Sequence, residues 1–207
     1  MTCLGRLMLA LCGFLVTGAL LGAVPPRPEQ GHEHSSLVGQ ILIASSKIAD
    51  PRFQRTVILM VRHSKEGAVG ITINRPMGEH SLASLLAMLG ENGSSVEGDV
   101  QIFAGGPVQP EAIFIIHTTD YARSETIPIN GRVAVTSSSQ VFHDIARNKG
   151  PGRTLIAFGY AGWGPSQLEA ELARNDWFTA AADADLIFEE RRERVWDSAM
   201  ARRFRDL

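Results

Sequence analysis

The stretch that most limits the possible folds of this chain runs from Arg153 to Leu172. A short apolar run over 154–158 is typical of a buried strand. Closely spaced glycines between 159 and 164 predict a loop, and Pro165 fits the first turn of a helix. The glycines either expose backbone N–H groups to an anion or polar ligand, or simply turn the chain. The second interpretation is favoured, because the spacing lacks the Lys-Ser/Thr ending of a nucleotide-binding loop.

Apolar runs elsewhere predict more strands than helices. The expected strands cover 39–45, 56–61, 68–74, 100–103, 112–117 and 133–136, with weaker strand signals over 124–129 and 186–188. The expected helices cover 81–90, a segment capped by Ser137 or Ser138, 165–173 and 191–204. Short turns join many neighbours, which favours antiparallel pairing. We therefore predict an α+β domain with a mostly antiparallel, strongly bent sheet.

The composition supports one globular domain without a metal or disulfide framework. The chain has 207 residues, of which 44% are hydrophobic, and this suits a single core. Its formal net charge of −2 provides no basic footprint for nucleic acid. Cys3 and Cys12 both lie near the N-terminus, so the rest of the chain can form neither a disulfide nor a cysteine metal site.

The N-terminal residues differ in character from the rest. Residues 1–24 resemble a targeting segment, with Arg6 followed by an uncharged apolar run, and fit a signal peptide, a membrane anchor or a wrongly assigned start. Residues 25–36 form a polar, proline-containing linker, and the folded domain is expected over 37–207. His32 and His34 lie in the linker and are too few for a metal site.

Four segments, in this order along the chain, resemble the YqgE/AlgH family of bacterial proteins. They are GQILIAS (39–45), EGAVGITINRP (66–76), FAGGPV (103–108) and FGYAGWGPSQLEAELARNDW (158–177). The resemblance covers about residues 37–200 and implies a single α+β domain around a contorted, barrel-like sheet. Some members are described as transcriptional regulators, and the resemblance implies no settled reaction.

The chain departs from the family pattern in a few places. Ser46 and Ser166 stand where members often have proline and glycine, which changes turns mildly. Typical members begin near the GQILIAS strand and look cytoplasmic. The segment before it instead indicates export or membrane anchoring, so the two signals disagree on location.

Polar residues gather where predicted strands end, and we expect the segments 74–76, 104–107 and 159–164 to converge. The candidate ligand-binding residues are Asn74, Arg75, Gly105, Gly106, Tyr160, Trp163, Gln167 and Glu169. Arg75 could bind a carboxylate or phosphate, or form a structural ion pair with Glu169. His63 and His117 could each act as a general base, although a hydrogen-bonded structural histidine is commoner.

The sequence favours a non-catalytic protein that acts through a small ligand or a protein partner, with any regulation of transcription indirect. No hydrolase or metalloprotease motif is present, and no catalytic residue, cofactor or metal is expected. One alternative is a small-molecule enzyme that uses Arg75 and a histidine beside the glycine loop. Another is direct DNA binding through the arginines of 191–204, although interleaved Glu193 and Asp197 favour a solvated face.

Overall fold

The computed structural model describes residues 36–203. These described residues belong to one compact unit. The expected targeting segment and most of the linker, including the linker histidines and both cysteines, lie outside the described residues and stay predictions. None of the helices within 36–203 has the length and apolar content that a membrane span requires.

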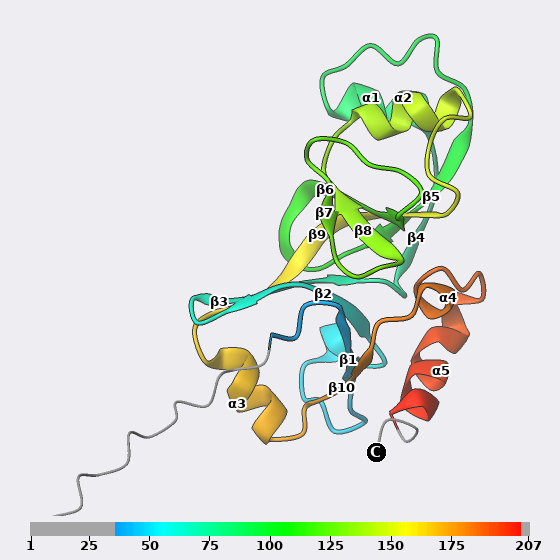
Figure 1. The fold of residues 1–207 in the computed structure, drawn as a ribbon. Helices are drawn as coiled ribbons and strands as arrows, with labels where there is room; N and C mark the ends of the chain where they lie inside the picture. The colour runs from blue at the N-terminus through cyan, green and yellow to red at the C-terminus, as the bar shows by residue number, and fades with distance from the viewer. Residues whose placement is uncertain (1–35, 204–207) are drawn as a thin grey trace, which may run out of the picture. The chain divides into compact units, whose positions relative to one another are not determined.

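The described residues form an α+β fold around a curled, ten-stranded sheet, as the sequence predicts (Figure 1). The strands are β1 (Gln40–Ala44), β2 (Val57–Ser64), β3 (Gly67–Thr72), β4 (Pro76–Ser81), β5 (Asp99–Ala104), β6 (Val108–Thr118), β7 (Ile127–Pro128), β8 (Val133–Thr136), β9 (Thr154–Trp163) and β10 (Trp177–Ala181). The helices are α1 (Leu82–Met88), α2 (Gln140–Ala146), α3 (Gln167–Ala173), α4 (Ala184–Ile187) and α5 (Val195–Arg202), with 3-10 turns η1 (Pro51–Phe53) and η2 (Arg192–Arg194).

Strand β9 joins the parts of the sheet. The main strand order is β10-β1-β2-β3-β9-β6-β8-β7, and β4 and β5 branch from it through β9. The end of β9 near Trp163 pairs with β3, whereas its beginning pairs with β6 on one side and β5 on the other. The β5–β9 pairing is parallel and the other pairings are antiparallel. A change in β9 therefore affects both parts of the sheet.

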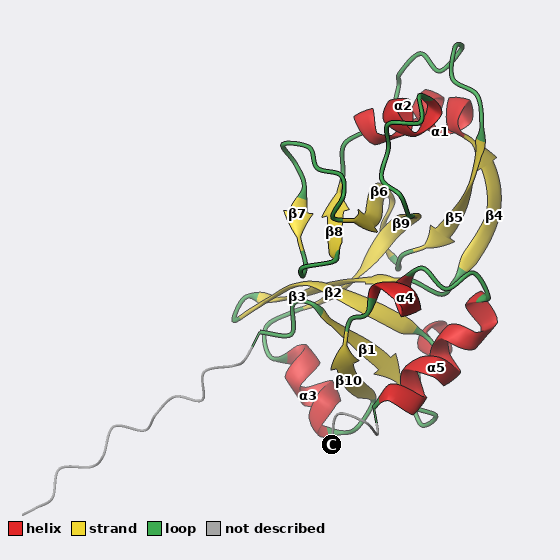
Figure 2. Ribbon diagram, turned by 45° about the vertical axis from the view of Figure 1, so that its right-hand side comes forward, coloured by secondary structure: helices red, strands yellow, loops and turns green. Residues whose placement is uncertain are grey.

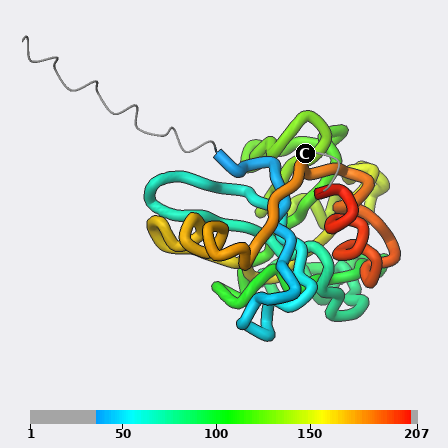
Figure 3. The backbone as a smooth tube through the Cα atoms, turned by 90° about the horizontal axis from the view of Figure 1, so that it is seen from below, coloured from blue at the N-terminus to red at the C-terminus, as the bar shows by residue number. Residues whose placement is uncertain are grey.

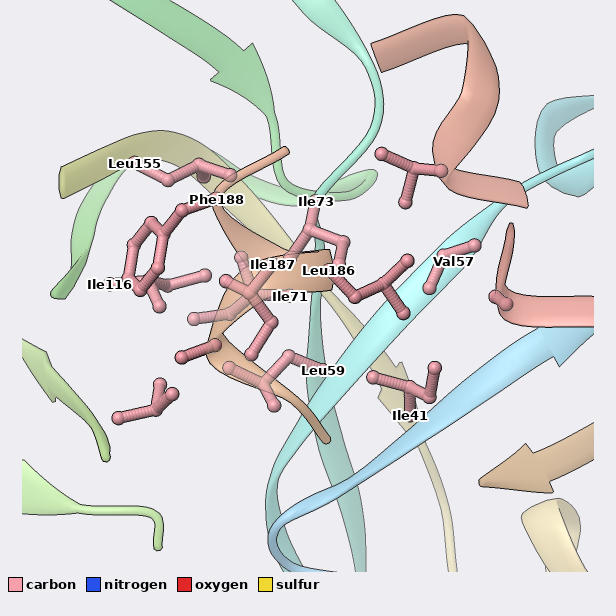
Figure 4. Close-up of a cluster of buried hydrophobic side chains, with 14 of the residues drawn as sticks. Ile41, Val57, Leu59, Ile71, Ile73, Ile116, Leu155, Leu186, Ile187 and Phe188 are labelled. Atoms are coloured by element: carbon pink, nitrogen blue, oxygen red, sulfur yellow. The ribbon is translucent and has the colours of Figure 1, made fainter. Parts of the chain in front are cut away.

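Strands β1 and β2 are apolar on both faces because helices cover both. Residues of one parity, such as Ile41 and Leu59, pack in a core cluster with residues of α4 and α5 (Figure 4). Residues of the other parity, such as Leu42 and Ile58, pack in a second cluster that includes Leu168 of α3. Successive strand residues point to opposite faces, so a strand that is buried on both faces needs a continuous apolar run. Such a run predicted β2 in the sequence. Figure 2 shows α3 and α5 on either side of these strands.

Helices α1 and α2 cover a third cluster over β5, β6 and β9 (Figure 2). Helix α1 buries Leu82, Leu85 and Leu86, at the helical spacing that predicted it. The hydroxyl of Ser81 accepts a hydrogen bond from the Ser84 backbone N–H and caps the helix start. The prediction of a short amphipathic helix here is confirmed.

Two strands and one helix were predicted wrongly or missed. The polar strand β4 gives little apolar pattern and forms by pairing with β5. The edge strand β10 is apolar but only five residues long, and it pairs with β1 soon after helix α3 ends. Residues 186–188, expected to be extended, lie in and just after α4, which begins where the Asp183 carboxylate accepts from the Asp185 N–H. A short apolar run fits a buried helix as well as a strand.

Two local predictions at turns and caps are also wrong, and the final helix differs in its bounds from the expected one. Strand β2 continues through Ser64, so the turn is shorter than the expected 63–67. Helix α2 is preceded by Ser139 instead of Ser137 or Ser138, and the Ser139 hydroxyl donates to Glu91 instead of capping the helix. The expected final helix divides into η2 and α5, and Phe204 lies outside the described residues.

The predicted glycine loop is part of β9. Gly159 has a φ of 70°, and a Cβ atom placed on it would lie 2.4 Å from the Gly106 carbonyl oxygen. A Cβ on Gly105 would lie 2.2 Å from the Gly159 carbonyl oxygen. The glycines therefore let two backbone segments approach more closely than side chains allow. The predicted loop over 159–164 is therefore wrong. The glycines adapt a strand to its neighbours, and the chain turns only after Trp163.

Candidate functional site

The candidate residues of β9 lie on opposite faces of the strand. Trp163 packs with Ala161 in the cluster that α3 covers. Tyr160 has the other parity and stacks edge-on against Phe114 of β6, with ring centroids 6.0 Å apart. Because side chains alternate along a strand, these two aromatic residues of one motif face two different hollows.

The three segments expected to converge do so through their backbones. The Ala104 N–H donates to the Arg75 carbonyl oxygen over 2.9 Å, and the Gly105 N–H donates to the Phe158 carbonyl oxygen over 2.7 Å. The Thr72 N–H donates to the Gly105 carbonyl oxygen over 2.8 Å. The predicted convergence is confirmed, and these backbone groups bond one another.

On the α3 side of β9 lies a hollow of about 410 Å³, here called the tryptophan groove. Its lining residues are Ile48, Ala49, Asp50, Arg52, Phe53, Pro107, Ala161, Gly162, Trp163, Gln167, Glu171, Arg174, Asp176 and Trp177. The volume lies within the range of small-molecule sites. Of the candidate residues, Trp163 and Gln167 line it, whereas Arg75 and Glu169 do not.

The carboxylate of Glu171 is the hub of the groove wall. One of its oxygens accepts from the indole N–H groups of Trp163 and Trp177 over 2.9 and 2.8 Å, and the other accepts from the Gln167 amide over 2.9 Å. The Gln167 amide oxygen accepts in turn from the Gly164 N–H over 3.1 Å. Trp163 and Trp177 are only 7% and 2% exposed, so these bonds fix a buried aromatic wall beside a partly buried carboxylate.

Two exposed ion pairs stand at the rim of the groove. Arg52 pairs with Asp50 over 2.7 Å, and Arg174 pairs with Asp176 over 2.9 Å. The hydrogen bond from Arg52 is the main reason that the pKa of Asp50 lies below its ordinary value. Together with Glu171, the lining holds three carboxylates against two guanidinium groups, so the groove has a slight negative excess.

The side chain of Arg75 points to the turn before β2 instead of to β9. Its guanidinium donates to the carbonyl oxygens of Arg52 and Gln54, over 3.2 and 2.7 Å, and to the hydroxyl of Thr56 over 2.9 Å. The expectation that Arg75 faces the backbone N–H groups of 159–164 is therefore wrong, and the alternative of an ion pair with Glu169 is also not the arrangement found. Arg75 instead bonds the turn that carries Phe53 into the groove.

Asn74 holds the same turn from the other side. Its amide oxygen accepts from the Val57 N–H over 2.9 Å, and its amide nitrogen donates to the Arg55 carbonyl oxygen over 2.8 Å. The neighbouring pair of polar residues at the end of β3 therefore contacts backbone groups at the start of β2. Asn74 and Arg75 do not line the groove, but they hold the turn that carries Phe53 into its wall.

The two candidate histidines are both engaged. The His63 Nδ1 accepts from the Leu37 backbone N–H over 3.1 Å, so the proton is assigned to Nε2, which lies 2.9 Å from the Glu169 carboxylate. His117 is 0% exposed, and its Nδ1 lies 2.9 Å from the Thr118 carbonyl oxygen while Nε2 lies 2.8 Å from the Thr136 hydroxyl. These contacts are typical of structural histidines.

On the other face of β9 lies a second hollow of about 490 Å³, here called the tyrosine cavity. Its lining residues are Val61, Arg62, Val69, Phe114, Glu125, Ile127, Ile129, Val135, Ser137 and Tyr160. Most are apolar side chains of strands β2, β3, β6, β7, β8 and β9 or of the segments next to them. The sequence predicted Tyr160 as a site residue but gave no sign of this cavity.

Two further polar clusters lie outside both hollows. The buried Asp144 carboxylate accepts from Tyr121 over 2.6 Å and from Arg123. Burial is the largest influence on the Asp144 pKa and raises it, but the hydrogen bonds from Arg123 and Tyr121 together hold this pKa below its ordinary value. Glu91 accepts from Ser139 and lies 3.0 Å from His143. Across 36–203 no group of three or more acidic, histidine or cysteine side chains could hold a metal ion.

Comparison with known proteins gives the family. A family model described as AlgH-like matches residues 41–207. The chain belongs to the AlgH-like family. A protein of Jannaschia sp. named as a UPF0301 protein is 42% identical over 84% of this chain and 90% of its own length. A UPF0301 protein of Rhodospirillum rubrum is 40% identical over 84% of this chain and 90% of its own length.

Solved structures show the same fold. The solution structure of the AlgH protein from Pseudomonas aeruginosa has a TM-score of 0.70 and 37% identity, and covers 82% of this chain and 89% of that one. A crystal structure of a protein from Corynebacterium diphtheriae, at 19% identity and a TM-score of 0.62, shares the fold alone. The AlgH-like family has no known biochemical role, and the resemblance found in the sequence is confirmed.

For this AlgH-like chain, sequence reasoning missed most of the groove wall. Glu171 lies four residues after Gln167 on the same helix face, and that spacing was the available signal. Phe53 and Trp177 reach the groove from the turn before β2 and from β10, which are far apart in the sequence. Their place in the site follows only from how the strands pair.

Proposed function

We propose that this AlgH-like protein is a non-catalytic binding protein whose tryptophan groove takes a small polar molecule. The observation that carries the proposal is the Glu171 carboxylate, held at the groove wall by two indole N–H groups and one amide. A polar group fixed in this way before a ligand arrives costs little further ordering on binding. Aromatic walls with a few oriented polar groups are typical of ligand sites.

The charges of the groove favour a neutral or positively charged ligand. Both rim arginines have a carboxylate partner, and Glu171 adds a negative charge. An anion would have to displace Asp50 or Asp176 from its guanidinium, whereas a ligand with N–H or ammonium donors could bond the carboxylates directly. The ligand class is therefore a small molecule with hydrogen-bond donors and a body that fits within about 410 Å³.

The enzyme alternative receives less support. Arg75 donates to backbone carbonyl oxygens and Thr56, and His63 and His117 are hydrogen-bonded away from both hollows. A general base must reach the proton that it removes from a substrate. Neither histidine lines the tryptophan groove or the hollow on the other face of β9, so we propose binding without a reaction.

Tryptophan fluorescence tests the groove. Trp163 and Trp177 lie in it, whereas Trp196 lies outside and donates to the Ala44 carbonyl oxygen. We would titrate a set of neutral and cationic polar metabolites into the full chain carrying Trp196→Phe, with thermal shift as a second readout. At least one should change the fluorescence and raise the melting temperature, and Glu171→Gln should weaken it. If nothing in the set does so, or if binding is unchanged in Glu171→Gln, the proposal is wrong.

We propose further that any effect on transcription is indirect. Several exposed arginines already have carboxylate partners, as in Arg55 with Asp197 and Arg153 with Asp185, and the formal net charge is −2. Proteins that bind DNA usually present a basic face. A titration of the purified protein with DNA at two salt concentrations should show weak, strongly salt-dependent binding at most. Sequence-specific nanomolar binding in physiological salt would contradict this.

A further inference from the structure

The tyrosine cavity has the size and lining of a ligand site, and it is separate from the tryptophan groove. It has a volume of about 490 Å³, and none of its lining residues also lines the groove. Its lining comes from strands that follow one another along the sheet path β2-β3-β9-β6-β8-β7, together with adjoining segments. Cavities of this volume are common for small organic ligands.

The body of the cavity is apolar. Val61, Val69 and Phe114 contribute from three different strands, and Ile127 at the edge strand β7 is 59% exposed. Val135 also lines the cavity and is buried. None of the residues that line the cavity belongs to a helix, whereas α3 contributes residues to the groove. Apolar side chains of the sheet are therefore not covered by a helix in the cavity. An apolar ligand would bury them and gain the associated hydrophobic free energy.

The polar groups of the lining have no partner among the described residues. The side chains of Arg62, Glu125, Ser137 and Tyr160 make no hydrogen bond or ion pair within residues 36–203. The nearest acidic neighbour of Arg62 on its own hairpin is Glu66, whose pKa is lowered mainly by the hydrogen bond from Ser64 and only slightly by the charges of Lys65 and Arg62. The Arg62 guanidinium is therefore available to a ligand.

We propose that the tyrosine cavity binds a small monocarboxylic acid with an apolar body, such as a medium-chain or aryl-substituted acid. The carboxylate bonds the fork of Arg62, with the Tyr160 hydroxyl as a second donor, and the apolar body lies against Phe114 and the valines. Glu125 repels a second negative charge, which favours a monoacid over a diacid. This inference concerns a different hollow from the groove and does not depend on the function proposed for it.

The test compares acids with an amide of the same shape. Octanoate and 3-phenylpropanoate are titrated into the full chain, with octanamide as the uncharged control, and backbone NMR shifts and calorimetry report binding. We expect both acids to shift residues of β2, β6 and β9 around the cavity. Octanamide should bind at least about tenfold more weakly, because one charge-assisted pair accounts for roughly that ratio.

Variants of the polar lining residues distinguish binding in the cavity from non-specific binding of the acids elsewhere on the protein. Arg62→Met should weaken octanoate binding by about tenfold, Tyr160→Phe should weaken it by a few-fold, and Glu125→Gln should strengthen it. Arg191→Met removes an exposed arginine elsewhere and should have no effect. The proposal is overturned if the acids do not bind, if acid and amide bind alike, if binding survives in Arg62→Met, or if the shifts fall on the groove instead.

Discussion

The two faces of β9 differ in how their polar groups are satisfied. In the tryptophan groove, Glu171 and the rim arginines all have partners within the domain. In the tyrosine cavity, the side chains of Arg62 and Tyr160 have none among the described residues. The groove is thus a prearranged polar wall, whereas the cavity is an apolar hollow with free polar groups near it. The same strand builds both because its side chains alternate.

The difference follows from what covers each face. Helix α3 lies beside β3 and contributes Gln167 and Glu171 to the groove (Figure 3). The cavity is lined by strands and the segments that join them. A helix brings polar residues at i and i+4 to one place, which allows a network such as the one around Glu171. Where only strands line a hollow, apolar positions dominate and the polar groups stay at its margins.

The largest effect is expected from Gly159→Ala, which should damage both faces at once. The added Cβ would meet the Gly106 carbonyl oxygen at 2.4 Å, and the residue would keep a φ of 70°. Overpacking and a left-handed conformation together should cost about 3 kcal/mol or more of unfolding free energy. Denaturant unfolding followed by circular dichroism measures this.

The matched control for this change is Gly131→Ala. A Cβ atom added to Gly131 would have no neighbouring atom within 4 Å, and the residue lies in an exposed bend of the chain. Its substitution should change the unfolding free energy by less than about 0.5 kcal/mol. Equal stability of the two variants would show that the close approach of β9 and the 105–106 segment is not needed.

Glu171→Ala should damage the groove and leave the cavity intact. Two buried indole N–H groups would lose their acceptor, which should cost about 2–3 kcal/mol of unfolding free energy. Glu111→Ala, at an exposed carboxylate of β6, is the control and should be nearly neutral. NMR shifts that spread from Glu171 to Phe114 and Val135 would contradict the independence of the two faces.

Arg75→Met should destabilise the fold by about 1–2 kcal/mol, because three acceptors in the turn before β2 lose a charged donor. The turn carries Phe53, so resonances in the groove should shift while those of the cavity do not. Arg75→Lys should recover part of the loss. Unchanged stability with abolished ligand binding would instead place Arg75 in a binding site.

Asp144→Asn should act near the cavity, since Asp144 bonds Arg123 and Tyr121, just before the segment with Glu125 and Ile127. The folded-state pKa of Asp144 is lowered, so its contribution to stability is present above the ordinary carboxyl pKa and is lost as the pH falls through the folded value. The variant should lose about 1 kcal/mol at pH 7. Unfolding measured from pH 7 to pH 3 should show this gap closing in acid, and a constant gap would contradict the assignment.

The smallest effect is expected from Arg52→Ala. Its ion pair with Asp50 is exposed, and exposed pairs contribute little to stability. The melting temperature should stay within error, whereas a cationic groove ligand should bind more tightly once this positive charge is gone. A large fall in melting temperature would mean that the rim supports the fold as well as the groove.

Local pattern in the sequence determined a good part of the fold. The continuous apolar run of β2 indicated a strand covered on both faces, and the spacing of Leu82, Leu85 and Leu86 indicated α1. The turn between β2 and β3 indicated their antiparallel pairing. Each of these signals arises from residues a few positions apart, which is the range over which a strand or helix repeats. These signals also indicated a strongly bent sheet, and the family resemblance added its barrel-like form.

Only the tertiary structure decided what the glycines and the polar motif residues do. Gly159 and Gly105 lie far apart in the sequence, and their need for a bare Cα exists only because two backbones meet there. Arg75 bonds backbone carbonyl oxygens, which no side-chain pattern reveals. Trp163 and Tyr160 belong to one motif but face two hollows, because β9 runs as a strand through the expected loop. Contacts of this kind depend on the path of the whole chain, and a local pattern carries no information about that path.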